Sequence, residues 1–320
     1  MKAAVLQQLG RAPVFGEFEE PVAGADEVVV RVRAASLKSV ERQIAAGSHY
    51  TSPKQLPVIC GVDGVGDLPD GTRVFFGGPR RPFGTMAERT VVPRAFCFPV
   101  PQSVDDATAA ALPNPGVSAW LVISHRAKLA KGESVLILGA TGVTGKLAVQ
   151  LAKLSGAARV VGAGRNAAAL RKLRELGADS TIPLDQPDGE LKENFAREAG
   201  ESGFHLVIDY LWGRPTEMLL AALTKSEFAA IQSETRLIQV GESAGPAIAL
   251  PSAVLRSTAL TISGTAGVPP REVLGAAMQQ VMDWAAKGVL RIETKQIPLA
   301  DIEQAWQRPA ESGHRIVVIP

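Results

Sequence analysis

The first hundred residues carry short apolar or alternating runs of the kind that form β-strands. These runs are separated by turn residues, and they cover 1–6, 27–34, 72–76 and 89–93. Short strands at this spacing predict a barrel or a sandwich. A helix is expected over 39–46, because Gly47 ends the helical pattern there.

From about Leu112 onward, strand-like runs alternate with helical periodicity. The run at 134–138 leads into glycines and then into a helical pattern over 146–154. Further strands are expected at 159–162, 180–182, 205–208, 236–240 and 260–263, and further helices at 167–176 and 271–287. This alternation predicts βαβ units and a parallel sheet covered on both faces. The closing run, 315–319, has no helix after it, so we expect it to rejoin the first domain and make the α/β domain an insertion.

Composition narrows the class of protein. A length of 320 residues favours two domains, and 46% hydrophobic with 21% charged residues is typical of a folded soluble chain. The formal net charge of +2 gives no electrostatic reason to expect nucleic acid or a membrane as partner. We see no signal peptide and no apolar stretch of about 18–20 residues, so a cytoplasmic location is expected. Cys60 and Cys97 form no CxxC pair, and we interpret both as core residues.

The clearest motif is the glycine turn after the run at 134–138. It reads Gly139-Ala-Thr-Gly-Val-Thr-Gly145 and opens an amphipathic helix, which is the Rossmann fingerprint with Ala140 in place of the first glycine. Gly142 would let a pyrophosphate approach the backbone, and Gly145 would let the helix pack on the strand. The free amides and positive dipole at the helix start would bind the phosphates. We therefore predict dinucleotide binding by Ala140, Thr141, Gly142, Val143 and Thr144; the alternative is an empty turn in a Rossmann-like scaffold.

The end of the next strand indicates which dinucleotide. An NAD site needs a carboxylate about 20 residues after the glycines, where this chain has Gly164, Arg165 and Asn166. Residues 134–174 contain no Asp or Glu but seven basic residues. A guanidinium at Arg165 can pair with a 2′-phosphate. We therefore predict NADPH, with Arg171, Lys172 and Arg174 on a solvated helix face.

Several segments resemble one enzyme family over essentially the whole chain. They are Ala34-Ala-Ser-Leu-Lys-Ser-Val-Glu41, Leu56-Pro-Val-Ile-Cys-Gly-Val-Asp-Gly-Val-Gly66, Gly84-Thr-Met-Ala-Glu88 and Leu112-Pro-Asn-Pro-Gly-Val-Ser-Ala-Trp120. With the later strand ends, they are similar to the zinc-independent quinone oxidoreductase branch of the medium-chain dehydrogenase/reductase superfamily. The resemblance implies an α/β fold with a GroES-like β-barrel catalytic domain and an inserted, doubly wound Rossmann domain.

The resemblance also implies domain limits, further cofactor contacts and an assembly. The catalytic domain would cover 1–112 and 263–320, the NADPH-binding domain 113–262, and a cleft between them would bring cofactor and substrate together. Ser118, Gly241 and Thr265 would line the cofactor groove. A homodimer is expected.

The positions of the first two catalytic zinc ligands in zinc-dependent relatives look like Lys38 and Val62 here. Neither side chain can ligate zinc, so no metal is expected. Lys38 would either donate a hydrogen bond to a substrate oxygen or extend to solvent. Tyr50 would either reach the active site or pack in its wall. Asp209 would orient backbone or cofactor, or end its strand in solvent.

Without a metal, hydride transfer needs an acceptor that is already electrophilic. We therefore expect an NADPH-dependent reductase of a small electrophile, either a quinone or an α,β-unsaturated carbonyl compound. The alternative is a low-turnover NADPH-binding protein that acts as a redox-sensing or RNA-binding partner. The near-zero net charge argues against RNA.

Overall fold

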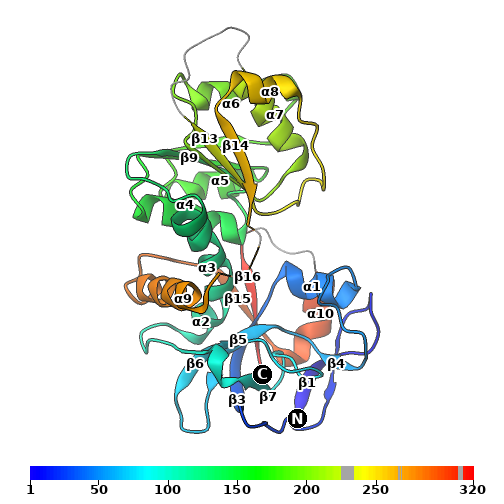
Figure 1. The fold of residues 1–320 in the computed structure, drawn as a ribbon. Helices are drawn as coiled ribbons and strands as arrows, with labels where there is room; N and C mark the ends of the chain where they lie inside the picture. Colours follow the sequence, from blue (N-terminus) through cyan, green and yellow to red (C-terminus); the bar gives the residue numbers. More distant parts are fainter. Residues whose placement is uncertain (225–233, 266, 268, 309–312) are drawn as a thin grey trace. The chain divides into compact units, whose positions relative to one another are not determined.

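The computed structural model describes residues 1–224, 234–265, 267, 269–308 and 313–320. The chain divides into two compact units, Met1–Asn114 with Met278–Pro320, and Pro115–Ala277 (Figure 1). The first division lies close to the predicted boundary at 112. The predicted end of the inserted domain at 262 falls inside a strand that pairs with the second unit's sheet, and the division lies later, within a long helix.

The first unit is built mainly from β-strands. Its seven-stranded sheet has the order β15-β16-β3-β5-β6-β8, with β7 also paired to β3, and a three-stranded sheet has the order β2-β1-β4. The strands are β1 (Lys2–Leu6), β2 (Val14–Glu17), β3 (Glu27–Leu37), β4 (Val58–Ile59), β5 (Asp63–Asp67), β6 (Arg73–Gly77), β7 (Arg89–Pro93), β8 (Cys97–Pro99), β15 (Thr294–Pro298) and β16 (Arg315–Ile319). Its helices are α1 (Ser39–Ala46), α2 (Asp106–Ala111) and α10 (Ile302–Gln307), with short 3₁₀ turns at Arg94–Phe96 and Leu299–Asp301.

The strand β3 organises this unit because it alternates buried and less buried positions. Val28, Val30 and Val32 contribute to one core with Phe76 and Met86. At its far end β3 pairs antiparallel with β16, through Leu37 with Ile316 and Ala35 with Val318. This pairing confirms the expected return of the closing strand to the first domain.

The second unit has a six-stranded sheet in which every neighbouring pair is parallel. Its order is β11-β10-β9-β12-β13-β14, so the chain starts in the middle and is wound outward in both directions. The strands are β9 (Ser134–Leu138), β10 (Arg159–Gly164), β11 (Ser180–Pro183), β12 (Leu206–Asp209), β13 (Thr235–Gln239) and β14 (Leu260–Gly264). This is the doubly wound Rossmann order that the family resemblance implied.

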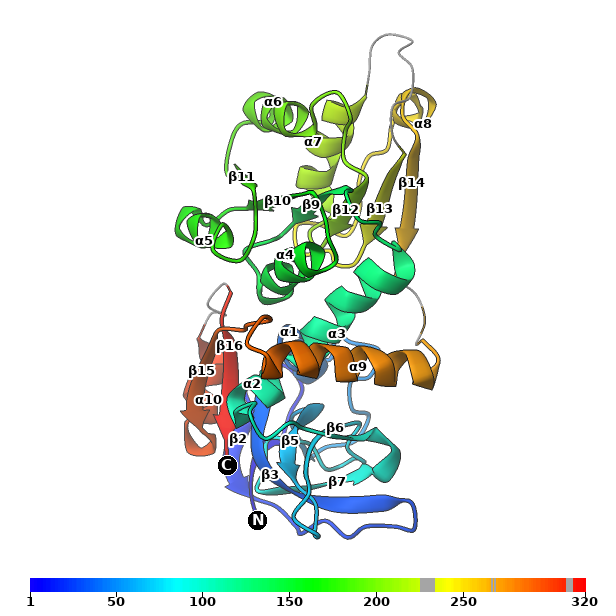
Figure 2. The ribbon, with the colours of Figure 1, turned by 90° about the vertical axis from the view of Figure 1, so that its left-hand side faces the viewer.

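Helices cover both faces of the parallel sheet. Figure 2 shows α4 (Val143–Leu154) and α5 (Ala167–Leu173) on one side, and α6 (Asp188–Ala199), α7 (Gly213–Leu223) and α8 (Ser252–Ser257) on the other. On the latter side, Leu191 and Phe195 of α6 pack with Leu219 of α7 against the sheet. The divisions between the units lie within α3 (Pro113–Leu121) and α9 (Arg271–Ala286), and a short π-helical turn, Val122–Arg126, follows α3.

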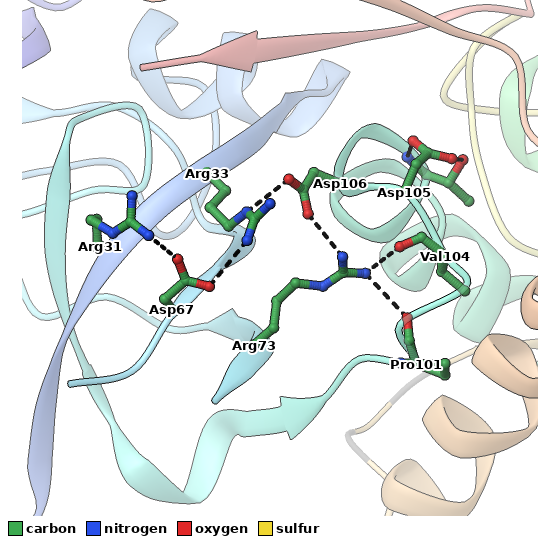
Figure 3. Close-up of polar contacts among 9 residues, drawn as sticks. Arg31, Arg33, Asp67, Arg73, Pro101, Val104, Asp105 and Asp106 are labelled. Carbon is green, nitrogen blue, oxygen red and sulfur yellow. Dashed lines mark hydrogen bonds and ion pairs between the residues drawn. The ribbon is translucent and has the colours of Figure 1, made fainter. Parts of the chain in front are cut away.

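An ion-pair network ties three strands of the first unit to the start of α2 (Figure 3). Arg33 Nε lies 2.8 Å from Asp106, and Arg33 Nη1 lies 3.4 Å from Asp67, which also pairs with Arg31. Arg73 Nη1 lies 3.3 Å from the same Asp106. Because each carboxylate has two cationic partners, the network joins elements that are distant in sequence.

No helix in the described part of the chain is both long and apolar enough to cross a bilayer.

Candidate active site

The predicted glycine turn lies at the carboxyl end of β9, where it opens α4. Gly139 adopts a φ of +85°, and the amides of Gly139 and Ala140 both donate to the Ala163 carbonyl, at 3.0 and 2.9 Å. Gly142 is the N-cap of α4, and no side chain caps the helix there. The first amides of α4 therefore have no partner within the helix, and they present the positive end of its dipole at the sheet edge.

The surroundings of the glycines in this turn explain why two of its positions hold no side chain. A Cβ on Gly145 would lie 2.3 Å from the Gly139 carbonyl oxygen and 2.6 Å from Ala140 Cα, so only glycine lets α4 pack on the turn. A Cβ on Gly142 would meet only the Gly139 oxygen, at 3.4 Å, so that residue faces open space. The first observation confirms the packing role predicted for Gly145, and the approach of a pyrophosphate at Gly142 stays a prediction.

The strand β10 ends at Gly164, and Arg165 and Asn166 follow it beside the glycine turn. The two places are adjacent because β10 and β9 are parallel neighbours, with Ala163 opposite Leu138. Arg165 is exposed, and within the described ranges its guanidinium has no hydrogen bond or ion pair. Asn166 instead caps α5, where its Oδ1 accepts from the Ala169 amide at 2.9 Å. Arg165 therefore presents a free cation at this edge, whereas Asn166 holds the following helix.

The remaining predicted cofactor residues are spread more widely. Gly241 follows β13 and Thr265 follows β14, so both lie at the same carboxyl edge as the glycine turn. A Cβ on Gly241 would lie 2.7 Å from the Tyr210 carbonyl oxygen. Ser118 lies on α3 and is exposed.

The Asp209 carboxylate, at the end of β12, orients the backbone of the turn that follows the strand. It is fully buried, its Oδ1 accepts from the amides of Leu211 and Trp212 at 2.8 Å each, and its Oδ2 accepts from the Thr216 hydroxyl at 2.5 Å. Burial raises the pKa of this carboxyl, although its hydrogen bonds oppose the shift. Of the two readings that the sequence left open, the structure shows the first, because Asp209 fixes the turn into α7.

Sequence reasoning missed Tyr210, which follows Asp209. Its hydroxyl is buried without a hydrogen-bond partner in the part of the chain that the structure describes. Burial raises the pKa of the phenol. A tyrosine directly after a strand of the parallel sheet was the only signal in the sequence.

Lys38 lies in the first unit, at the N-cap of α1, and is only 4% exposed. Its Nζ lies 2.6 Å from Asp63 Oδ1, 2.7 Å from Glu41 Oε1 and 2.9 Å from Ser36 Oγ. Burial by itself would lower the pKa of the ammonium, but Asp63 and Glu41 outweigh it and raise that pKa. The structure thus contradicts extension of Lys38 to solvent. Its ammonium donates to Asp63 and Ser36 and forms an ion pair with Glu41, and a hydrogen bond to a substrate oxygen stays a prediction.

A fourth charged group belongs to this cluster. Arg315, from β16, donates to the Leu37 carbonyl at 3.4 Å, and its charge interacts with Glu41 and Asp63. Burial lowers the pKa of its guanidinium. The cluster of Lys38, Arg315, Glu41 and Asp63 is therefore electrically balanced, and it joins α1 to β5 and β16.

A cavity of about 350 Å³ in the first unit adjoins this cluster through Glu41. That volume is typical of a small-molecule site. The wall includes Cys60 and Val62, so it contains one of the positions that the resemblance assigns to a zinc ligand. Burial raises the pKa of the Cys60 thiol to about 12, with Glu41 adding to the shift and Arg81 opposing it. Cys60 is thus a neutral thiol at ordinary pH, as its reading as a core residue implied.

Tyr50 does not line this cavity and packs in no wall. Its side chain is 94% exposed and lies against the His49 ring, with 4.2 Å between the ring centroids. This exposure contradicts packing in a wall, and the predicted place of Tyr50 in an active site stays a prediction.

The fold and these sites define a two-domain enzyme class with a Rossmann nucleotide domain, and comparisons with known proteins agree. The zinc-binding dehydrogenase family matches residues 143–287, which exclude Lys38 and Val62. A probable NADPH-dependent quinone reductase, tdiC, from Emericella nidulans is 25% identical, with 96% of each chain covered. An NADPH-dependent alkenal/one oxidoreductase from Arabidopsis thaliana is 31% identical over 57% of this chain and 52% of its own.

Among solved structures, the quinone oxidoreductase from Thermus thermophilus, which was also solved in complex with NADPH, is 28% identical. It superposes with a TM-score of 0.79, and each chain is covered completely. The present chain is therefore similar to the quinone oxidoreductase-like branch of the medium-chain dehydrogenase/reductase superfamily.

Proposed function

We propose that this chain is an NADPH-dependent oxidoreductase that reduces quinones or α,β-unsaturated carbonyl compounds without zinc. The observation that carries the proposal is the free Arg165 guanidinium beside an uncapped, glycine-lined helix start. The similarity to NADPH-dependent quinone and alkenal/one reductases supports it.

Residues at the carboxyl edge of the parallel sheet would hold NADPH. The first amides of α4 would bind the pyrophosphate, and the open face of Gly142 would let it approach. Arg165 would pair with the 2′-phosphate, a contact that NADH lacks. Residues 134–174 include no carboxylate that would repel that phosphate.

The cavity of the first unit would hold the acceptor. Its mostly apolar wall would hold a flat, conjugated molecule, and the Lys38 ammonium lies 2.7 Å from the Glu41 carboxylate at this wall. When bound, NADPH supplies two electrons and a hydrogen as hydride, and water supplies the proton that completes the reduced product. We assign Lys38 the role of a positioning residue, because its ammonium and its backbone amide both hold the Glu41 carboxylate in place.

We base zinc independence on the two positions where zinc-dependent relatives hold their first two catalytic zinc ligands. Lys38 and Val62 offer no ligand atom, and the Lys38 ammonium already supplies a cation to Asp63 and Glu41. A chelator should therefore leave the reductase activity unchanged. Activity that is lost with the chelator and restored by zinc would contradict this part of the proposal.

The main experiment follows NADPH oxidation by the purified chain with a panel of quinones and enones, with NADH in parallel. We expect oxidation of NADPH by at least one acceptor and a higher kcat/KM with NADPH than with NADH. Tight NADPH binding without oxidation by any acceptor would favour the low-turnover binding protein instead. Absence of NADPH binding would overturn the proposal. The homodimer, the cytoplasmic location and the lack of a nucleic-acid partner stay predictions.

A further inference from the structure

The charged groups that face the cavity of the first unit are few. Its lining is mostly apolar, with Leu6, Ile44, Val58 and Phe83 among the wall residues, and among the residues that the structure describes only Glu41 and Arg81 are charged members of this wall. The electrostatic character of the cavity therefore depends on how these two charges are compensated.

Glu41 is compensated within the protein. Its carboxylate lies 2.7 Å from the Lys38 ammonium, and it also accepts the Lys38 amide at 2.8 Å. Lys38 and Arg315 together balance Glu41 and Asp63. An anionic ligand in the cavity would therefore meet a balanced cluster and not an isolated negative charge.

Arg81 is not compensated. Its Nη2 donates to the Thr51 carbonyl at 2.5 Å, which fixes the side chain on the wall, but a carbonyl brings no charge. Across the residues that the structure describes, no carboxylate pairs with Arg81. The guanidinium has five N–H donors, so the bond to Thr51 leaves most of them available.

We propose that Arg81 selects acceptors that carry an anionic group, so that the preferred substrate is a quinone or enone with an apolar body and a carboxylate or similar anion. This inference rests on the proposed function, because it names the substrate class of the same cavity. A guanidinium pairs bidentately with a carboxylate, and an apolar wall then holds the remainder of the molecule. Arg81 is a specificity residue here and takes no part in hydride transfer.

The test compares two acceptors that differ only in charge. One is a methyl enone whose alkyl tail ends in a carboxylate, and the other is its methyl ester. We expect the wild-type enzyme to have a severalfold higher kcat/KM for the carboxylate. Arg81→Gln should lower kcat/KM for the carboxylate about tenfold, through KM, and change the value for the ester by less than about twofold. Arg81→Lys should lose less, because it keeps the charge without the planar fork.

Lys54→Gln serves as the matched control. Lys54 is exposed, lies in the same loop as Thr51 and does not line the cavity, so it reports the effect of removing one nearby positive charge. It should leave both acceptors unchanged within about twofold. Higher ionic strength should also reduce the preference for the carboxylate in the wild type.

Two results would overturn the inference. One is equal turnover of carboxylate and ester by the wild type, and the other is an equal loss for both acceptors in Arg81→Gln, which would give Arg81 a catalytic or structural role. Thermal unfolding and NADPH affinity of each variant show whether the fold is intact. If the wild type oxidises no NADPH with either acceptor or with any quinone, the result would instead contradict the proposed function.

Discussion

Replacing Lys38 with methionine should destabilise the first unit strongly. Lys38→Met keeps the length of the side chain but leaves Asp63 and Glu41 buried with one cation fewer. Removing one partner of a buried ion pair costs about 3–5 kcal/mol, because the remaining charge has no compensation. For a unit of this size that corresponds to a fall in Tm of roughly 6–20 °C.

The stability of the wild type should depend on pH through the charge of the Lys38 ammonium. The folded-state pKa of Lys38 lies above its ordinary value of 10.5, so the stabilisation by its charge is complete below that pH and is lost only as pH rises through the folded-state pKa. Differential scanning calorimetry across this range measures both effects. Lys54→Met, at an exposed lysine, is the control. A fall in Tm no larger for Lys38→Met than for Lys54→Met would refute the reasoning.

The other predictions concern the nucleotide edge, the cavity thiol and a helix cap. Arg165→Ala should weaken NADPH binding about tenfold and leave NADH nearly unchanged, as measured by calorimetric titration; equal effects would remove Arg165 from the 2′-phosphate. Gly145→Ala should weaken both cofactors alike, since the added Cβ would displace α4, and unchanged binding would contradict the packing argument. Cys60 should show no thiolate absorbance until pH approaches its pKa of about 12. Asp105→Ala should lower the free energy of unfolding by about 1 kcal/mol, because its carboxylate caps α2 by accepting the Thr108 amide at 2.9 Å; a difference within error in urea titrations would count against the cap.

The best-predicted elements were those whose local sequence alone shows both the apolar pattern and the residues that end it. The bounds of β9, α1 and β16 match the predictions, because each has a regular apolar pattern with a clear end, such as Gly47 after α1. The parallel sheet covered on both faces followed from the alternation of strands and helices, whereas the doubly wound Rossmann order was implied by the family resemblance.

The strand β5 shows what a local pattern cannot reveal. Its sequence, Asp-Gly-Val-Gly-Asp, reads as a turn. A Cβ on Gly66 would lie 2.3 Å from the Arg31 carbonyl, and one on Gly64 would lie 2.7 Å from that of Ala34. The glycines therefore allow close approach to β3, a partner that is distant in sequence. The helix α6 was also missed, although Leu191, Phe195 and Ala199 form a narrow stripe at helical spacing.

The candidate site also has a part that local sequence predicts and a part that only the fold reveals. The turn from Gly139 to Gly145 could be predicted because one segment contains the whole motif. The environment of Lys38 could not, because Asp63 and Arg315 reach it from other strands. The charge of Lys38 was evident in the sequence, and only the fold shows which oxygens surround it.

The pairing of β3 with β16 has a consequence for biosynthesis. The second unit is one continuous stretch of chain, so it can acquire its structure while translation continues. The first unit cannot finish its sheet at that stage, since the partner of Leu37 is Ile316. On the ribosome, the hydrophobic edge of β3 stays open until β16 has been synthesised, and nascent chains that still lack β16 should be the form that most needs chaperone protection.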